Sequence, residues 1–246
     1  MKTLASYSIK GGVGKTACSV NLAYAAAEAG NRTLLVDLDP QGASSFYFRI
    51  RPSQNVKPKG FFTKQSKIEN AIRGSDYPRL DVLPANLHFR KFDQLLGSLH
   101  KARNRLRDAL ARSADQYDIV VLDCPPTIGL LSENVFMAAD MIVVPVIPTT
   151  LSERTFEQLL TFFRKSGYPA QRIVAFFSMV QSNNRLHQET MRRMQSQYKR
   201  FLNTVIPQST DIERMGTHRE PVLCYAPSRP GSLAYRHLCE ELLRKL

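Results

Sequence analysis

The chain of 246 residues contains no tryptophan and only four cysteines, which lie far apart at Cys18, Cys124, Cys224 and Cys239. No two of them form a C-x-x-C pair, so they offer neither a zinc site nor a dithiol redox centre, and we interpret them as small buried hydrophobic residues in a reducing compartment. No apolar run approaches the ~20 residues that span a membrane. The N-terminal residues also lack the apolar core of a signal peptide. We therefore expect a cytoplasmic protein.

Acidic residues are scarce as well: 21 Asp and Glu stand against 34 Lys and Arg, which gives a formal net charge of +13. A field of this sign favours a polyanion such as nucleic acid or an acidic membrane face, although a charged surface also serves solubility alone. Fifteen basic and five acidic residues lie between Arg49 and Arg112. A second basic group follows later in the chain, and its members are Arg185, Arg192, Arg193, Lys199, Arg200, Arg214 and Arg219.

Short β-branched or apolar runs alternate with helical patterns along the chain, which predicts one α/β domain, residues 1–246. Its mostly parallel, twisted sheet should carry helices on both faces. The expected strands are residues 3–9, 33–37, 80–83, 118–123, 141–146, 173–178 and 204–206. The expected helices are residues 16–29, 95–114, 153–165, 189–201 and 232–246. Residues 49–67 lack the strand and helix patterns of the rest of the chain. They contain six basic residues, two prolines and a glycine, which predict an elaborated basic loop.

A glycine-rich segment follows the first expected strand and opens the first expected helix: Lys10-Gly11-Gly12-Val13-Gly14-Lys15-Thr16. It fits the variant phosphate-loop pattern K-G-G-x-G-K-[ST]. The glycines let backbone N–H groups close around a phosphate chain, and the helix N-terminus adds its partial positive charge. In such a loop Lys15 reaches the β- and γ-phosphates, and the Thr16 hydroxyl is a ligand of Mg²⁺. The segment predicts a P-loop NTPase that binds ATP and Mg²⁺.

Aspartates end two further apolar runs, at Asp37 and Asp39 in one and at Asp123 in the other. An aspartate at the carboxyl end of a buried strand lies beside the nucleotide, where it can hold Mg²⁺ through a water. We expect Asp123 and Asp37 near the metal, although a purely structural role at the strand end is equally open for Asp37. Many fast P-loop ATPases carry a glutamate base directly after the aspartate that corresponds to Asp123, whereas this chain has Cys124 at that position. Asp39 is then the expected water-orienting group, and hydrolysis should be slow.

With Lys10 at the start of the loop, the chain resembles the ParA/MinD family of deviant Walker A ATPases, and most of all a stand-alone ParA-type partition ATPase. The resemblance implies that Lys10 crosses a dimer interface to the partner's nucleotide. Later segments also resemble those of the family, namely Phe177-Ser178-Met179-Val180, Val205-Ile206-Pro207 and Tyr225-Ala226-Pro227-Ser228-Arg229-Pro230-Gly231. They imply contacts to the nucleotide from Met179 and Pro227. The chain departs from the family at Ala17, where relatives often carry a threonine, and at Gln181, close to where many carry an aspartate.

These inferences define three sets of site residues. The catalytic set is Lys10, Lys15 and Asp39, and the metal set is Thr16, Asp37 and Asp123. The nucleotide-binding set is Lys10, Gly11, Gly12, Val13, Gly14, Lys15, Thr16, Ala17, Met179 and Pro227.

The resemblance implies an ATPase that forms a homodimer on ATP, binds double-stranded DNA without sequence preference and positions a plasmid, chromosome or protein cargo on the nucleoid. A ParB-like or cargo-adaptor protein would stimulate its slow hydrolysis. Non-specific binding needs Lys and Arg directed at phosphates rather than base readers. The expected DNA contacts are Arg192, Arg193, Lys199, Arg200, Arg214 and Arg219, with the earlier basic group as the competing location.

Other functions compete with this interpretation. A MinD-like ATPase that works on a membrane surface would end in an additional amphipathic helix, but residues 232–246 have the apolar stripe of a core helix, at Leu238, Leu242 and Leu246, so we expect no membrane partner. A small-molecule ligase of the dethiobiotin synthetase type shares the P-loop scaffold. An electron-transfer reductase of the nitrogenase iron-protein kind would need cluster-binding cysteines, for which the spacing offers no convincing pair. A regulator that binds ATP without turnover is the last alternative, against which Asp39 argues.

Overall fold

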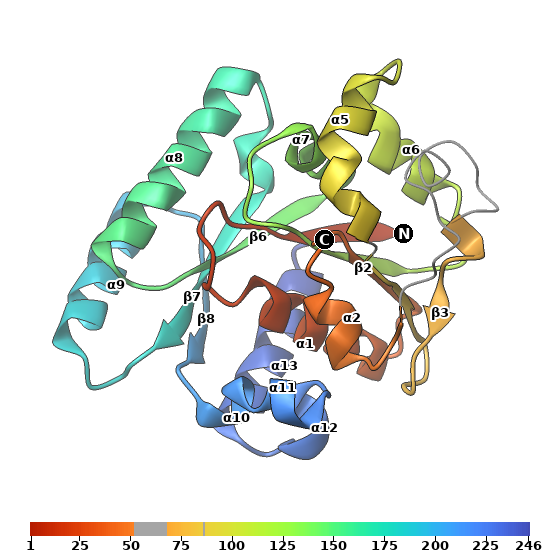
Figure 1. The fold of residues 1–246 in the computed structure, drawn as a ribbon. Helices are drawn as coiled ribbons and strands as arrows, with labels where there is room; N and C mark the ends of the chain where they lie inside the picture. The colour runs from red at the N-terminus through yellow and green to blue at the C-terminus, as the bar shows by residue number, and fades with distance from the viewer. Residues whose placement is uncertain (52–67, 86) are drawn as a thin grey trace.

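A computed structural model describes residues 1–51, 68–85 and 87–246. Eight strands of this part of the chain form one sheet in the order β3-β4-β2-β5-β1-β6-β7-β8 (Figure 1). Neighbouring strands run parallel except for the β3–β4 pair, which is antiparallel. The strands are β1 (Lys2–Ser6), β2 (Thr33–Asp37), β3 (Arg73–Gly74), β4 (Leu80–Leu83), β5 (Ile119–Asp123), β6 (Met141–Val146), β7 (Ile173–Val180) and β8 (Phe201–Pro207). The predicted mostly parallel sheet is confirmed.

Helices cover both faces of this sheet (Figure 1). The lower face in that view carries α1 (Lys15–Glu28), α2 (Ala43–Tyr47), α10 (Thr210–Glu213), α11 (Met215–His218), α12 (Val222–Tyr225) and α13 (Pro230–Leu243). The opposite face carries α5 (Phe92–Gly97), α6 (Arg105–Ala111), α7 (Leu130–Ala138), α8 (Thr150–Ser166) and α9 (Arg185–Gln197). Most of the basic loop expected at 49–67 lies outside the described residues, including Lys57, Lys59, Lys64 and Lys67.

Two apolar layers enclose the sheet because side chains alternate between its faces along each buried strand. On β5, Val120 and Leu122 belong to the layer beneath α5–α9, whereas Ile119 and Val121 belong to the layer that contains α1 and α13. Leu238 and Leu242 of α13 are fully buried in this second layer, so the apolar stripe of the last helix is part of the core, as predicted. Within the described residues, no helix combines the length and the apolarity needed to cross a membrane.

The predicted single helix over 95–114 is wrong. The chain forms α5 and α6 there, separated by residues 98–104, where Lys101 takes the left-handed conformation at φ 54°. Asn134 of α7 holds the interruption in place, because its side-chain oxygen accepts from the Leu106 N–H at 3.1 Å and its amide donates to the Ala102 carbonyl at 2.7 Å. Packing against α7 therefore overrides the local preference for one helix.

Boundaries of other elements also differ from the predictions. The first strand ends at Ser6, not at residue 9, so the loop that follows is longer than expected. The helix predicted at 189–201 begins four residues earlier, because the Asn184 side chain accepts from two backbone N–H groups of its first turn. That helix ends at Gln197, and Phe201 begins the edge strand β8 instead.

Candidate nucleotide site

The glycine-rich loop joins β1 to α1 at the carboxyl end of the sheet. Gly12 and Gly14 take φ values of +69° and +91°, which other residues adopt only with strain. A Cβ at Gly14 would also lie 3.1 Å from the Ser178 hydroxyl and 3.7 Å from the Met179 methyl group, so the loop packs directly against the end of β7. Gly14 is the N-cap residue of α1 and has no side chain that could accept a hydrogen bond from the first turn of the helix. The first amide donors of α1 are therefore left for an anion, as a phosphate loop requires.

Both loop lysines make contacts within their own chain. Lys15 is only 7% exposed, and its Nζ donates to the Lys10 carbonyl at 3.2 Å. Burial lowers the pKa of Lys15, with the nearby Asp123 carboxylate acting in the opposite direction. Lys10 Nζ donates to the Ser152 hydroxyl at 3.1 Å, which turns this side chain onto the start of α8. The contact of Lys10 with a partner's nucleotide stays a prediction.

Two fully buried carboxylates, Asp37 and Asp123, lie next to each other at the ends of β2 and β5. Asp123 accepts from the Ser19 hydroxyl at 3.0 Å and from the Ser44 hydroxyl at 2.6 Å. Asp37 Oδ2 accepts from the backbone N–H and the hydroxyl of Ser45, at 2.9 and 2.7 Å. Its Oδ1 is buried and has no hydrogen-bond partner among the described residues.

The environment of this pair favours a cation. Burial, and then the charge of Asp123, raise the pKa of Asp37 from 3.8 to about 7. Burial also raises the pKa of Asp123, while hydrogen bonds from Ser44, Thr16 and Ser19 act against the shift. Carboxylate and hydroxyl oxygens are ligands that Mg²⁺ prefers, so the predicted set of Thr16, Asp37 and Asp123 fits this ion. The described residues contain no group of three or more His, Cys, Asp or Glu that could hold a metal by itself, and Mg²⁺ would take its other ligands from phosphate and water.

Asp39 lies two residues beyond β2, in the turn between that strand and α2. Its Oδ1 accepts from the Gln41 N–H at 2.9 Å, and its carbonyl accepts from the Gly42 N–H at 2.9 Å. The side chain lines a cavity of about 440 Å³ together with Arg90, Asp93 and Pro125. A half-buried carboxylate that lines an open cavity suits the predicted role of orienting a water, whereas Cys124 is buried and its thiol pKa is raised by burial.

Comparison with known proteins identifies the family. The model of the family described as AAA domain (AAA_31) matches residues 1–173. The chromosome partitioning protein ParA of Caulobacter vibrioides is 30% identical to this chain, over 100% of the chain and 95% of its own length. This chain belongs to the ParA family of ATPases.

Solved structures with the same fold contain nucleotides. Cobyrinic acid a,c-diamide synthase from Mycobacterium smegmatis, with bound ADP and magnesium, is 27% identical with a TM-score of 0.82, and the match covers 99% of this chain and 94% of that one. A putative plasmid partition protein from Borrelia burgdorferi, bound to AMPPNP, is 22% identical with a TM-score of 0.82, over 100% and 99% of the two chains.

The late motif of this ParA-family chain lies at another cavity, of about 460 Å³, near α10–α12. Pro227 lines it together with Arg214 and the rings of His218 and Tyr225, which stack with centroids 4.0 Å apart. Stacked rings beside a proline suit a nucleotide base, and the base contact of Pro227 stays a prediction. Ala17 is half-buried on the first turn of α1, next to Thr16.

The predicted DNA contacts divide between two places. Arg192 and Arg193 lie on α9 and Lys199 and Arg200 follow it, whereas Arg214 and Arg219 flank α11 under the other face of the sheet (Figure 1). Three of the six make internal contacts. Arg193 pairs with Glu153 at 2.6 Å, Arg200 donates to the Ala170 carbonyl, and the Arg219 guanidinium lies 4.5 Å from the Phe46 ring centroid. Arg192, Lys199 and Arg214 are exposed.

The serines that surround the buried carboxylates were not among the predicted site residues. Ser44 and Ser45 open α2 directly after the segment that contains Asp39, and Ser19 lies one turn into α1. The signal was present in the pattern, because a pair of small hydroxyl residues begins a helix just beyond an acidic strand end. Each serine supplies a hydroxyl donor to one of the two buried carboxylates.

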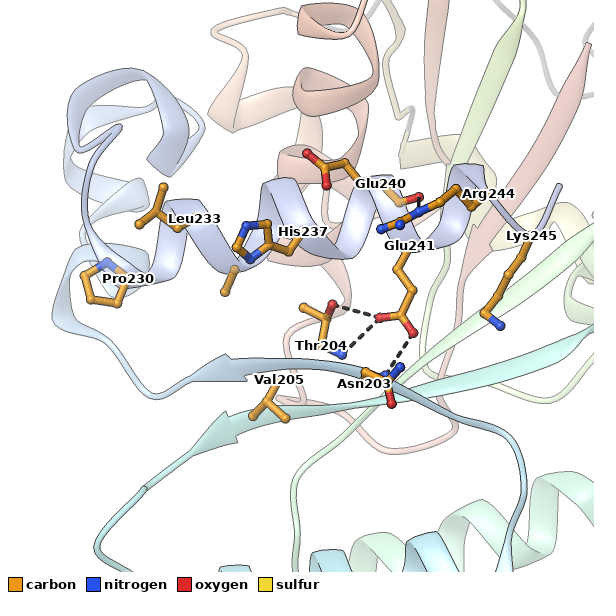
Figure 2. Close-up of a pocket in the computed structure, with 11 residues that line it drawn as sticks. Asn203, Thr204, Val205, Pro230, Leu233, His237, Glu240, Glu241, Arg244 and Lys245 are labelled. Carbon is orange, nitrogen blue, oxygen red and sulfur yellow. Dashed lines mark hydrogen bonds between the residues drawn. The ribbon is translucent and has the colours of Figure 1, made fainter.

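A cavity of about 750 Å³ lies away from these residues, between the edge strand β8 and α13 (Figure 2). Glu241 of α13 accepts there from the backbone N–H groups of Asn203 and Thr204, at 2.9 and 3.0 Å, and from the Thr204 hydroxyl at 2.8 Å. The carboxylate thus joins the last helix to the edge strand. None of the residues that line this cavity belongs to the predicted nucleotide or metal sets.

Proposed function

We propose that this ParA-family chain is a partition or positioning ATPase that dimerises when it binds ATP and Mg²⁺. The ATP-bound dimer binds double-stranded DNA without sequence preference, and a ParB-like or cargo-adaptor protein stimulates its slow hydrolysis. The protein would act in the cytoplasm, on the nucleoid. The observation that carries the proposal is the placement of a phosphate loop, two buried carboxylates and Asp39 at one edge of the sheet.

Each residue of this site has a separate task in the proposed cycle. The loop amides and Lys15 bind the phosphates, and Lys15 neutralises their charge. Thr16, Asp37 and Asp123 would hold Mg²⁺, which would supply positive charge to stabilise the negative charge that develops on the phosphate. Asp39 orients the attacking water from the side of its cavity. Since Cys124 supplies no base, Asp39 acts without a neighbouring glutamate, which agrees with slow turnover.

A second candidate function is the formation of an amide or a related bond on a small-molecule carboxylate, driven by ATP. The likeness to cobyrinic acid a,c-diamide synthase favours it, because that enzyme shares the fold over 99% of this chain. The cavity beside Asp39 and Arg90, of about 440 Å³, has the size of a small-ligand pocket. The +13 net charge and Lys10 favour the partition ATPase instead.

One experiment separates the two functions. Duplex DNA of two unrelated sequences is titrated with the wild-type protein in the presence of ATP, a non-hydrolysable ATP analogue or ADP. The partition ATPase should bind both duplexes equally with ATP or its analogue, and at least tenfold more weakly with ADP. Binding that ignores the nucleotide, or no binding at low salt, contradicts the proposal and leaves the ligase as the function to test with carboxylate acceptors.

A further inference from the structure

We propose that Ser152 is a positioning residue that holds the Lys10 ammonium against α8 in the nucleotide-free protomer, and that ATP-driven dimerisation breaks this contact. The inference rests on the proposed function, in which Lys10 turns to the partner's nucleotide. Ser152 lies in the first turn of α8 and is only 4% exposed. Its hydroxyl lies 3.1 Å from Lys10 Nζ and 3.0 Å from the hydroxyl of Thr149, the N-cap residue.

The contact restrains the side chain of Lys10 on a backbone that is already fixed. The Lys10 N–H donates to the Ser8 hydroxyl at 3.2 Å, and the Lys10 carbonyl accepts from Lys15 Nζ at 3.2 Å. Both backbone groups of Lys10 are thus hydrogen-bonded, and the contact with Ser152 adds a restraint on its side chain. The Ser152 hydroxyl therefore decides where the ammonium lies before a nucleotide arrives.

The electrostatics of this position make the contact easy to reverse. The N-terminus of a helix carries a partial positive charge, which disfavours an ammonium group beside it. Glu153 is the acidic residue of this first turn, but its carboxylate is paired with Arg193 of α9 at 2.6 Å. Lys10 is thus held by a neutral hydroxyl near an unfavourable helix end. The phosphates of a nucleotide offer this ammonium a far stronger partner.

Removal of the Ser152 hydroxyl should therefore strengthen the dimer. Each protomer gives up one Lys10–Ser152 contact on dimerisation, and the net worth of such a hydrogen bond corresponds to about a threefold change per lysine. In Ser152→Ala, the dissociation constant of the dimer with a non-hydrolysable ATP analogue should fall about tenfold, because both protomers contribute. Sedimentation measures this constant, and ATP affinity at concentrations where the protein is monomeric should stay within about twofold of wild type.

Three variants exclude a merely structural role. Ser152→Asp offers Lys10 an ionised partner and suits a helix N-terminus, so it should weaken the dimer, opposite to Ser152→Ala. Ser152→Thr keeps the hydroxyl and should restore wild-type dimerisation. The matched control is Thr155→Ala, which removes a hydroxyl of the same helix that donates to the Leu151 carbonyl at 2.8 Å, and it should leave the dimer unchanged.

A double variant links the effect to Lys10. In a Lys10→Ala background, Ser152→Ala should cause no further change, because the contact is already absent. If Lys10→Ala weakens the dimer while Ser152→Ala matches wild type or weakens it too, the positioning role is wrong and the proposed function stands. Wild-type protein that stays monomeric with the analogue, or a Lys10→Ala variant that dimerises normally, contradicts both.

Discussion

Asp37 and Asp123 are register partners on the adjacent parallel strands β2 and β5, and both carboxylates are fully buried. Two like charges in this position oppose each other, and a shared proton or a cation relieves the repulsion. The serines of α1 and α2 donate to three of the four carboxylate oxygens and leave Asp37 Oδ1 without a partner in the described residues. The apo site therefore favours a proton, which Mg²⁺ would displace.

This pair predicts an inverse dependence of apo stability on pH. The pKa of Asp37 is about 7 in the folded state and 3.8 as its ordinary value, so between these values the folded state holds a proton that the unfolded state has lost. The contribution of Asp37 to the free energy of unfolding should then fall as pH rises from about 4 to about 7, by at most about 1.4 kcal/mol per pH unit. Urea unfolding in EDTA at pH 5, 6, 7 and 8 measures this slope.

The Asp37→Asn variant is the control for that slope. It keeps an oxygen that can accept from Ser45 and removes the titrating group, so the decline between pH 5 and 7 should flatten. The variant should also gain roughly 1 kcal/mol of apo stability at pH 8, because one buried charge is gone. An equally steep slope in Asp37→Asn would show that another group is responsible.

Substitution of Asp39 should impair ATP hydrolysis but not ATP binding. Asp39→Ala should bind ATP and Mg²⁺ with wild-type affinity but hydrolyse ATP at least about 100-fold more slowly, because water orientation and phosphate binding lie on different residues. Asp39→Asn can still accept from the Gln41 N–H that fixes the turn, so it tests the charge alone. Single-turnover hydrolysis and ATP titration decide this together, and wild-type turnover in both variants removes Asp39 from the mechanism.

Substitution of the two loop lysines should impair two different properties, nucleotide binding and dimerisation. Lys15→Ala should lose nucleotide binding itself, since this buried ammonium lies at the start of α1 where the phosphates are expected. Lys10→Ala should bind ATP within about threefold of wild type yet lose the ATP dimer. ATP titration and sedimentation with a non-hydrolysable analogue measure the two properties. Equal losses of ATP affinity would place both lysines on the same nucleotide.

Much of the site could be predicted because its chemistry depends on local sequence. The phosphate loop needs glycines at fixed offsets, and Gly12 and Gly14 do take positive φ values. Asp37 and Asp123 end buried apolar runs, and parallel pairing brings such ends to one edge. By contrast, the contact of Lys10 with Ser152 joins residues 142 positions apart, and no local pattern specifies it.

The errors in the fold have a similar cause. The sequence from 95 to 114 favours one helix locally, but Asn134 stabilises a break there from a distant helix. Likewise, Phe201 continues a helical pattern, yet its ring stacks on Phe177 of β7 with centroids 4.2 Å apart and belongs to a strand. Tertiary contacts overrode helix propensity at both places.

DNA binding should depend most on those exposed basic residues for which the described part of the chain shows no side-chain ion pair or hydrogen bond. Arg192 and Lys199 are exposed, whereas Arg193 pairs with Glu153 and Arg200 donates to the Ala170 carbonyl. In the ATP state, an Arg192→Glu/Lys199→Glu variant should therefore weaken binding to every duplex sequence alike and leave ATP affinity unchanged. Each lost phosphate contact should reduce the slope of log K against log salt by about 0.9.

A charge-matched control tests whether this effect belongs to the α9 surface. Arg244→Glu/Lys245→Glu changes the net charge equally at exposed residues by the end of α13, and should reduce affinity only slightly through the overall field. The competing location is tested in parallel with glutamate at Lys57, Lys59, Lys64 and Lys67. A larger loss from these four lysines would move the DNA contact to the early basic group. If no variant changes duplex affinity at low salt, the positive charge serves another acidic partner.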